Sequence, residues 1–342
     1  MKGDLESYGL LRILSKIFSL LFRLLIEKSL VLIYNFMDVF VSSCLIVFDV
    51  SLKKVFIFDF WRKKVAHCVV PEAEAILDKE FPVLDKGFVR LVDYFGGDQR
   101  IVQSARVSYG EGTKTVSQDG ALIDYLLRHQ HTSPFEQVVM TFHVKMPIFV
   151  ARQLVRHRMG RMNEVSGRYS IMKEEFYVPQ EDKVSPQSVN NKQGRASEAF
   201  DKQTAEKIIQ QLSEGQKEAY ENYSELIDAG LAREIARINL PLSLYTEFYW
   251  QMDLHNLFHF LKLRLDSHAQ YEIRVYAQVL LEICKKVAPM ATESFINHMN
   301  EGVNFSGEEM DALRAVLDGK ENPLQGKKLE RFNEKIKTGV QL

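Results

Sequence analysis

Residues 140–155, MTFHVKMPIFVARQLV, place a strand and a helix in direct succession. Apolar and polar residues alternate from Met140 to Lys145, which is the period of a half-buried strand. Pro147 suits the first position of a helix, so we expect a helix from Ile148 to Val155. This stretch therefore predicts a fold that combines strands with helices.

The flanking sequence repeats both patterns. Before the stretch we expect a strand over 88–92 and helices over 72–77, 101–108 and 120–129. After it, apolar positions at helical spacing predict a long helix that ends at Gly230, followed by helices over 231–240, 254–265 and 268–287. Together these elements predict the α/β or α+β class, with a mixed central sheet flanked by long helices.

The overall composition is that of a globular protein. The chain has 342 residues, of which 46% are hydrophobic, and its formal net charge is −1, so disorder and a fully basic surface built for nucleic acid are both disfavoured. Its three cysteines, Cys44, Cys68 and Cys284, form no C-x-x-C pair. This cysteine usage favours a reducing, cytoplasmic location.

The first 64 residues differ from the rest of the chain, because residues 10–60 are far more apolar than the sequence after them. We call residues 1–64 the leader. It is too long and too often interrupted by charge for a cleavable signal, and three interpretations stay open: a helix at a membrane surface, a packed appendage, or translated upstream sequence. Membrane contact by the leader is therefore undecided. The catalytic domain is expected over 65–306, with a peripheral helical tail over 307–342.

Arginine is concentrated in one short segment, where Glu164 is the only acid. Several guanidinium groups that converge where a helix gives way to a loop can bind phosphate, whereas a solvated arginine surface would serve only solubility. Hydrogen-bonding residues and a glycine are interleaved with these arginines, which favours a binding site. The arginines are Arg152, Arg156, Arg158, Arg161 and Arg168, and the interleaved residues are Asn163, Ser166, Gly167 and Tyr169.

Arg156-His157-Arg158, followed by seven residues and then Ser166, resembles the RHR-x7-S signature of the flavin-dependent thymidylate synthases. Three longer blocks are similar to the same family: HTSPFEQVVMTFHVKMPIFVARQLVRHR at 131–158, AREIARINLPLSLYTEFYW at 232–250 and FHFLKLRLDSHAQYEIR at 258–274. The resemblance covers roughly residues 69–300. The leader and about the last 30 residues lie outside it.

This resemblance implies a reaction and an assembly. Reduced FAD would take the methylene group of methylenetetrahydrofolate and deliver it to C5 of dUMP, with reducing equivalents from NADPH. Members of the family are homotetramers whose active sites are shared between subunits, and they bind FAD without a Rossmann domain. The residues agree on two points: Gly110-Glu111-Gly112 lacks the third glycine of a dinucleotide motif, and none of the cysteines lies in an electropositive polar motif that would activate a nucleophile.

Residue roles follow from the matching positions. The resemblance assigns Arg264 to activation of the pyrimidine, as the catalytic residue. Flavin binding falls to Ser108, His131, Arg156, His157, Arg158, Glu164, Asp253, Leu254, His255 and His259. Binding of dUMP falls to Gln153, Leu154, Val155, Arg156, Glu164, Val165, Ser166, Gly167, Arg168, Arg237 and Arg264, the last two arriving from elsewhere in the assembly.

Three points qualify the transfer. Arg233 shares a helical face with Arg237 and is expected to be a structural ion-pair partner. His255 and His259 have the spacing of metal ligands, but without a third ligand nearby no metal is expected. Arg161 stands where many relatives have serine, so an extra positive charge could meet the flavin pyrophosphate or the folate.

Two other functions remain open from the residues. Another flavin-dependent oxidoreductase could use the same phosphate clamp for a different nucleotide. A non-enzymatic nucleic-acid-binding module could use the arginine-rich segment, although the chain lacks a basic overall charge and a recognised nucleic-acid motif. We therefore expect dUMP, and no nucleic acid, as the partner.

Overall fold

The computed structural model describes residues 68–107, 116–189 and 192–338. All of them belong to one compact unit, His67–Leu342. Ser108, Cys44 and the whole leader lie outside these described residues. Within the described ranges, no helix combines the length and the apolar character that crossing a membrane requires.

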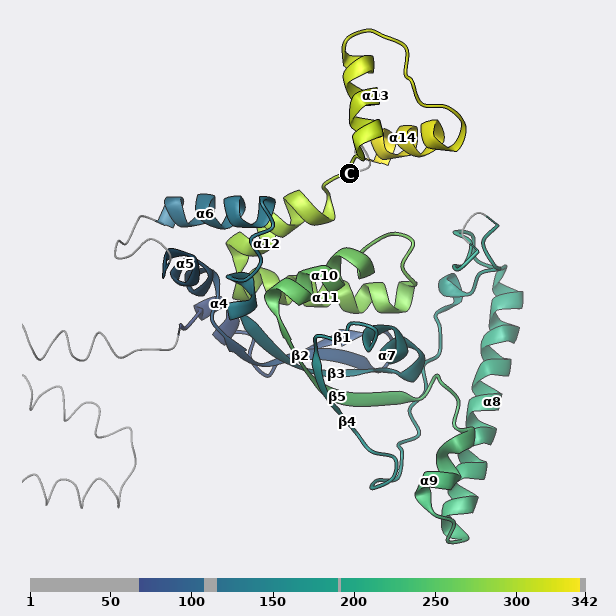
Figure 1. The fold of residues 1–342 in the computed structure, drawn as a ribbon. Coiled ribbons are helices and arrows are strands. Elements are labelled where there is room, and N and C mark those ends of the chain that lie inside the picture. The colour runs from purple at the N-terminus through teal and green to yellow at the C-terminus, as the bar shows by residue number, and fades with distance from the viewer. Residues whose placement is uncertain (1–67, 108–115, 190–191, 339–342) are drawn as a thin grey trace, which may run out of the picture. The chain divides into compact units, whose positions relative to one another are not determined.

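Five strands form one sheet in the order β1-β2-β3-β5-β4 (Figure 1). Every pairing between these described strands is antiparallel, so the expectation of a mixed sheet is wrong, while the α+β class is confirmed. The longest ladder joins β3 to β5 from Val139↔Asp253 to Pro147↔Tyr245. The strands are β1 Glu80–Val83, β2 Gly87–Phe95, β3 Val139–Pro147, β4 Arg161–Glu164 and β5 Tyr245–Asp253.

One face of the sheet packs against α10 and α11 (Figure 1). Because side chains alternate along a strand, Phe142 and Trp250 point into this core and are fully buried, while their neighbours His143 and Tyr249 point to the opposite face. Phe258 and Tyr276 supply buried surface from the helices. The helices nearest this core are α7 Ile148–Leu154, α10 Leu254–Arg264, α11 Tyr271–Val287 and α12 Pro289–Phe295.

The remaining helices surround the sheet or follow it in the chain. The longest, α8, carries Asp201 as its N-cap and is followed by Gly230, whose φ of +84° is the left-handed conformation that ends many helices. The last two helices have a small core of their own, made by Ala312, Leu324 and Phe332. The helices are α4 Pro71–Glu74, α5 Asp98–Arg106, α6 Val116–Arg128, α8 Lys202–Asp228, α9 Arg233–Ala236, α13 Gly307–Leu317 and α14 Gly326–Thr338.

Most predicted elements are present, with shifted ends. The strands expected over 88–92 and 140–145 are the middles of β2 and β3, and the helices expected over 254–265 and 268–287 are α10 and α11. The helix expected over 231–240 is shorter: α9 gives way to a 3-10 turn at Arg237–Asn239. Sequence patterns predicted neither β4 nor β5, although β5 lies between β3 and β4 in the sheet.

Candidate active site

The arginine-rich segment turns the chain from α7 into β4. Pro147 precedes α7 with φ −61°, and the helix ends at Leu154, just before the Arg156-His157-Arg158 triplet. Gly160 then passes against the Trp250 indole so closely that a Cβ atom there would overlap the ring nitrogen. A glycine is therefore required at the point where this turn meets the sheet.

Two arginines of the triplet are free to bind a ligand. Arg156 and Arg158 are exposed, and neither forms an ion pair or a hydrogen bond with any residue that the structure describes. Guanidinium groups without a carboxylate partner leave uncompensated positive charge, and their forked donors match phosphate oxygens. This donor set fits an anionic, phosphate-bearing ligand.

The middle residue of the triplet, His157, contacts Arg264 at the end of α10. The Arg264 Nε donates to His157 Nε2 at 3.2 Å, so this ring nitrogen must be an acceptor and the imidazole is neutral. Burial, and then the positive charge of Arg264, lower the pKa of His157 to about 4. His157 therefore orients Arg264 without adding a second positive charge.

Arg264 is also tied to α7. Its terminal nitrogen donates to the Gln153 carbonyl oxygen at 3.4 Å, and partial burial lowers the pKa of the guanidinium from its ordinary value. Because arginine stays protonated throughout the working pH range, Arg264 is a fixed positive charge and cannot act as a general base. We call Arg264, His157 and Gln153, together with Arg156 and Arg158, the first group.

A second group forms where β4 ends. Glu164 accepts a hydrogen bond of 2.6 Å from the hydroxyl of Thr246, which is buried in β5. Ser166 Oγ accepts the Arg168 backbone N–H at 3.3 Å, so the hydroxyl proton of Ser166 is still available to a ligand. Gly167 is buried and lies against the Arg237 side chain, where a Cβ atom would come within 3.1 Å of that residue's Cδ.

Helix α9 completes the second group within the same chain. Arg168 pairs with Glu234 at 3.2 Å, although both side chains are more than half exposed. Arg233 donates to the Tyr169 carbonyl oxygen at 3.0 Å, so it holds the loop through the backbone and not as the ion-pair partner that the sequence suggested. Arg237 lies against Gly167 within this chain. That it joins the dUMP site from elsewhere in the assembly stays a prediction.

The structure thus divides the predicted dUMP-binding residues. Gln153 and Arg264 belong to the first group, while Ser166, Gly167, Arg168 and Arg237 belong to the second. No hydrogen bond or ion pair among the described residues joins Gln153 or Arg264 to the second group. Within the described residues the two groups are thus separate hydrogen-bonded clusters.

Comparison with known proteins assigns the family. The family model described as "Thymidylate synthase complementing protein" matches residues 90–290, and the model described as "Thymidylate synthase ThyX C-terminal domain" matches 303–342. The chain belongs to the flavin-dependent thymidylate synthase family. The second match also shows that the tail lies within the family pattern, so the expectation that the tail falls outside the resemblance is wrong.

Individual relatives agree with this assignment. A flavin-dependent thymidylate synthase of Treponema denticola is 65% identical over 266 residues, which cover 78% of this chain and 100% of that protein. One from Treponema pallidum is 58% identical over 293 residues, or 86% of this chain and 96% of that protein. This second match is longer than the segment from residue 65 to the C-terminus, so it reaches into the leader.

Solved structures share the fold. Crystal structures of the UMP/dUMP methylase PolB from Streptomyces cacaoi, bound with 5-Br UMP or 5-Br dUMP, are 33% and 32% identical, each with a TM-score of 0.58. Each alignment covers 64% of this chain, and 97% and 99% of the PolB chain respectively. The likeness therefore extends over nearly the whole of that methylase.

The flavin-binding positions expected for a family member lie on several separate elements of the chain. His259 lies 6.0 Å from His157 between ring centroids, beside the first group. His131 lies among Tyr125 and His129 at the end of α6. Asp253 caps α10 by accepting the Asn256 N–H at 2.9 Å. Ser108 lies outside the described residues.

Other predicted positions can reach a ligand only in a limited way. The side chains of Leu154 and Leu254 are buried in the core, so only their backbone atoms can contact a ligand. Val155 and His255 are half-buried, and Val165 is exposed while its N–H is bonded to the Glu247 carbonyl oxygen. Among the described residues, no group of three or more His, Cys, Asp or Glu side chains could hold a metal ion.

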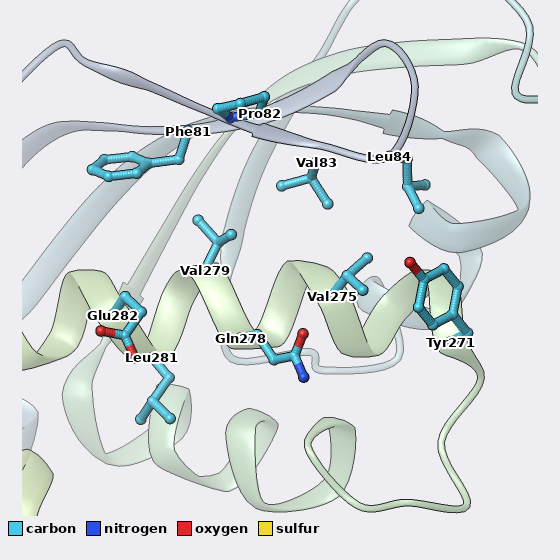
Figure 2. Close-up of a pocket in the computed structure, with 10 residues that line it drawn as sticks. All are labelled: Phe81, Pro82, Val83, Leu84, Tyr271, Val275, Gln278, Val279, Leu281 and Glu282. Atoms are coloured by element: carbon cyan, nitrogen blue, oxygen red, sulfur yellow. The ribbon is translucent and has the colours of Figure 1, made fainter. Parts of the chain in front are cut away.

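The apolar groove between β1 and α11 is not part of this site. It has a volume of about 610 Å³, and Phe81, Leu84 and Val279 line it (Figure 2). None of the predicted site residues borders it, and it offers no arginine or lysine for a phosphate. A nucleotide would therefore not be recognised there.

The cysteines of the described residues are not activated nucleophiles. Cys284 is completely buried, and burial raises the pKa of its thiol far above the ordinary value. Partial burial also raises the pKa of Cys68, although the nearby Arg100 opposes this effect. Both thiols therefore stay protonated near neutral pH, and a protonated thiol is a weak nucleophile.

Thr246 is a part of the site that the sequence patterns did not predict. Its buried hydroxyl holds Glu164, and it lies in the block at 232–250 that carried the resemblance. A threonine in an aromatic-rich strand is ordinarily a packing residue. Only the register Glu164↔Phe248 places Thr246 within reach of this acid, and a register is not visible in the sequence.

Proposed function

We propose that this chain methylates dUMP to dTMP, with methylenetetrahydrofolate as the one-carbon donor and with FAD that NADPH reduces. The observation that carries the proposal is the contact between Arg264 and the neutral His157, flanked by the unpaired Arg156 and Arg158. Family membership supports it, and the structural neighbours, which are named UMP/dUMP methylases, support a uridine nucleotide as the substrate.

The first group has the donors that FAD binding needs. Arg156 and Arg158 would hold the negatively charged pyrophosphate, and Arg161, which is exposed on β4, could add charge beside it. His157, His259 and Asp253 would border the cofactor. Bound FAD would supply the electrons that convert the transferred methylene group into a methyl group. Since these donors lie on an antiparallel sheet and its helices, no Rossmann domain is needed.

The second group is suited to the phosphate of dUMP. Ser166 keeps a hydroxyl proton to donate, and Arg168 and Arg237 add positive charge on either side of Gly167. Gly167 has no side chain, so Arg237 can pack closely against this loop. Glu164, held by Thr246, would orient donors of the ligand.

Arg264 would activate the pyrimidine. Its fixed positive charge beside the N3–C=O edge of uracil would favour the N3-deprotonated ring, which raises the electron density at C5 for attack on the methylene carbon. His157 accepts the Arg264 Nε–H, which leaves the outer edge of the guanidinium to the ligand. The family resemblance carries this role, and the contact supports it.

We further propose a homotetramer with shared sites, which the family resemblance implies and which the separation of the first and second groups supports. If dUMP needs Arg264 from one subunit and Arg168 from another, two inactive variants should complement each other. We expect co-refolded Arg264→Ala and Arg168→Ala subunits to regain part of the turnover that each lacks alone. Failure to regain any turnover, with a tetramer shown by light scattering, would contradict shared sites. The same proposal includes a cytoplasmic location, a catalytic domain over 65–306 followed by a peripheral helical tail, and an activity that does not require the leader.

Absorbance spectroscopy and NADPH oxidation test the function. We expect the purified full-length protein to show a bound-flavin spectrum that changes on addition of dUMP, and to oxidise NADPH faster when dUMP is present. A flavin spectrum without any response to dUMP would favour another flavin-dependent oxidoreductase. Salt-sensitive binding of polyanions without flavin would favour a nucleic-acid-binding module.

A further inference from the structure

Glu272 is a buried carboxylate for which the proposed reaction has no use. It lies in the first turn of α11 and is only 3% exposed. Its Oε1 accepts from the Tyr177 hydroxyl at 3.0 Å and from Arg195 at 2.5 Å, while its Oε2 accepts from the Gln270 amide at 2.8 Å. A carboxylate that is paired with arginine can only accept, so the amide NH₂ of Gln270 must face Glu272.

This constraint passes along a row of amides. Because its NH₂ faces Glu272, Gln270 turns its carbonyl oxygen Oε1 the other way, where it accepts from Gln153 Nε2 at 2.5 Å. Gln153 must then keep its own NH₂ toward Gln270. Its Oε1 accepts no hydrogen bond from any residue that the structure describes. The negative charge of Glu272 therefore determines, through Gln270, which way the Gln153 amide points.

The end of this row lies in the first group. Gln153 is half-buried on α7, and its backbone carbonyl accepts from Arg264, the residue proposed to activate the pyrimidine. The side-chain oxygen Oε1 of Gln153 adds a hydrogen-bond acceptor to this group, in which Arg264, Arg156 and Arg158 offer only donors. The first group therefore contains both donors and one acceptor of fixed orientation.

We infer that Glu272 and Gln270 are positioning residues that fix Gln153 as a hydrogen-bond acceptor for dUMP, an inference that rests on the proposed function. The group that Gln153 would accept from is the 3′-hydroxyl of deoxyribose, because the proposed activation by Arg264 removes the proton from uracil N3 and leaves no donor there. If the amides of Gln270 and Gln153 turned round, Gln153 would present an N–H group in place of its oxygen and could no longer accept from the nucleotide. The row thus contributes to the choice of ligand and not to the chemical step.

Ligand discrimination tests this inference. Calorimetry on the FAD-bound full chain would compare dUMP with 2′,3′-dideoxy-UMP, which lacks the 3′-hydroxyl. We expect the wild-type protein to bind this analogue about three- to tenfold more weakly than dUMP, as the loss of one hydrogen bond predicts. In Gln153→Ala and Gln270→Ala the ratio should fall below about twofold, with a raised KM for dUMP and little change in kcat.

Two further variants distinguish a lost orientation of the Gln153 amide from general damage to the fold. Glu272→Gln keeps the size of the side chain but allows the row to reverse, so it should lose the same discrimination. Gln278→Ala makes the matched change at an exposed position of α11 away from the row and should keep the wild-type ratio.

The results have distinct meanings. A wild-type protein that binds neither dUMP nor 2′,3′-dideoxy-UMP would overturn the proposed function itself. Normal dUMP binding by the wild type with no discrimination against 2′,3′-dideoxy-UMP would overturn the acceptor role of Gln153. Full wild-type discrimination in Gln270→Ala would overturn the positioning role of the row while leaving the proposed function intact.

Discussion

Arg264→Ala should reduce dTMP formation by a factor of about 10²–10³, the range seen when one preorganised donor is removed from developing negative charge. In the structure Arg264 is held from two sides, by His157 Nε2 at 3.2 Å and by the Gln153 carbonyl at 3.4 Å. The charge is thus fixed before a ligand binds. FAD should be retained, because Arg156 and Arg158 do not depend on this contact.

The same substitution has a second consequence that can be measured without turnover. Burial is the largest cause of the low pKa of His157, and the charge of Arg264 is the next. Removal of that charge should raise the pKa of His157 from about 4, although burial keeps it below the ordinary value of about 6.5. NMR titration of the His157 ring protons would follow this change.

Arg264→Lys and Lys262→Ala serve as comparisons. Lysine keeps the positive charge but lacks the planar fork, so Arg264→Lys should keep part of the activity and show an altered pH–rate profile. Lys262→Ala removes one positive charge from the same helical turn at an exposed position and should leave turnover unchanged. Near wild-type dTMP formation by Arg264→Ala would refute the assignment, and the pyrimidine activator would then be sought at Arg168 or Arg237.

Four further changes extend the account. Replacement of all three cysteines by alanine should leave turnover intact at a stability cost of about 1–3 kcal/mol; loss of dTMP formation with folding and flavin content intact would restore a thiol mechanism. Ser166→Ala should weaken dUMP binding by about 1.5–3 kcal/mol yet leave measurable turnover, and a nucleotide adduct mapped to Ser166 by mass spectrometry would contradict this. Folding lowers the pKa of His157 to about 4, so between about pH 6.5 and 4 the unfolded chain binds more protons than the folded chain. The free energy of unfolding should therefore fall as the pH is lowered through this range. Urea titrations should show a weaker pH dependence for His157→Gln than for the wild type. A protein that begins at residue 65 should bind FAD and turn over, and aggregation or failure to form the oligomer would show that the leader is integral.

The fold was predictable where one periodicity dominates. The alternation in β3 and the helical spacing in α8, α10 and α11 fix the type of each element, and only their ends moved. Strand β4, with the sequence RMNE, is short and mostly polar, so no local signal marks it. Strand β5 is different: its Tyr, Thr, Phe and Trp residues favour a strand, so the residue types do carry a local signal for it.

The candidate site was predictable in its residue types but not in its arrangement. A motif records which residues act, and distances between separate elements depend on register and packing, which one sequence does not contain. The contacts of His157 with Arg264, and of Gly167 with Arg237, join segments more than 60 residues apart. Burial likewise restricts Leu154 and Leu254 to backbone contacts, because the apolar side of each helix faces the core.

Carbon transfer to dUMP is the most direct test of the central claim. The FAD-bound full-length protein would be incubated with dUMP, NADPH and methylenetetrahydrofolate labelled in its methylene carbon, and the nucleotides would be separated and analysed by mass spectrometry. The account predicts dTMP with the label in its C5 methyl group, and none when FAD or dUMP is left out. NADPH oxidation by the flavin-loaded protein with no labelled dTMP would contradict it.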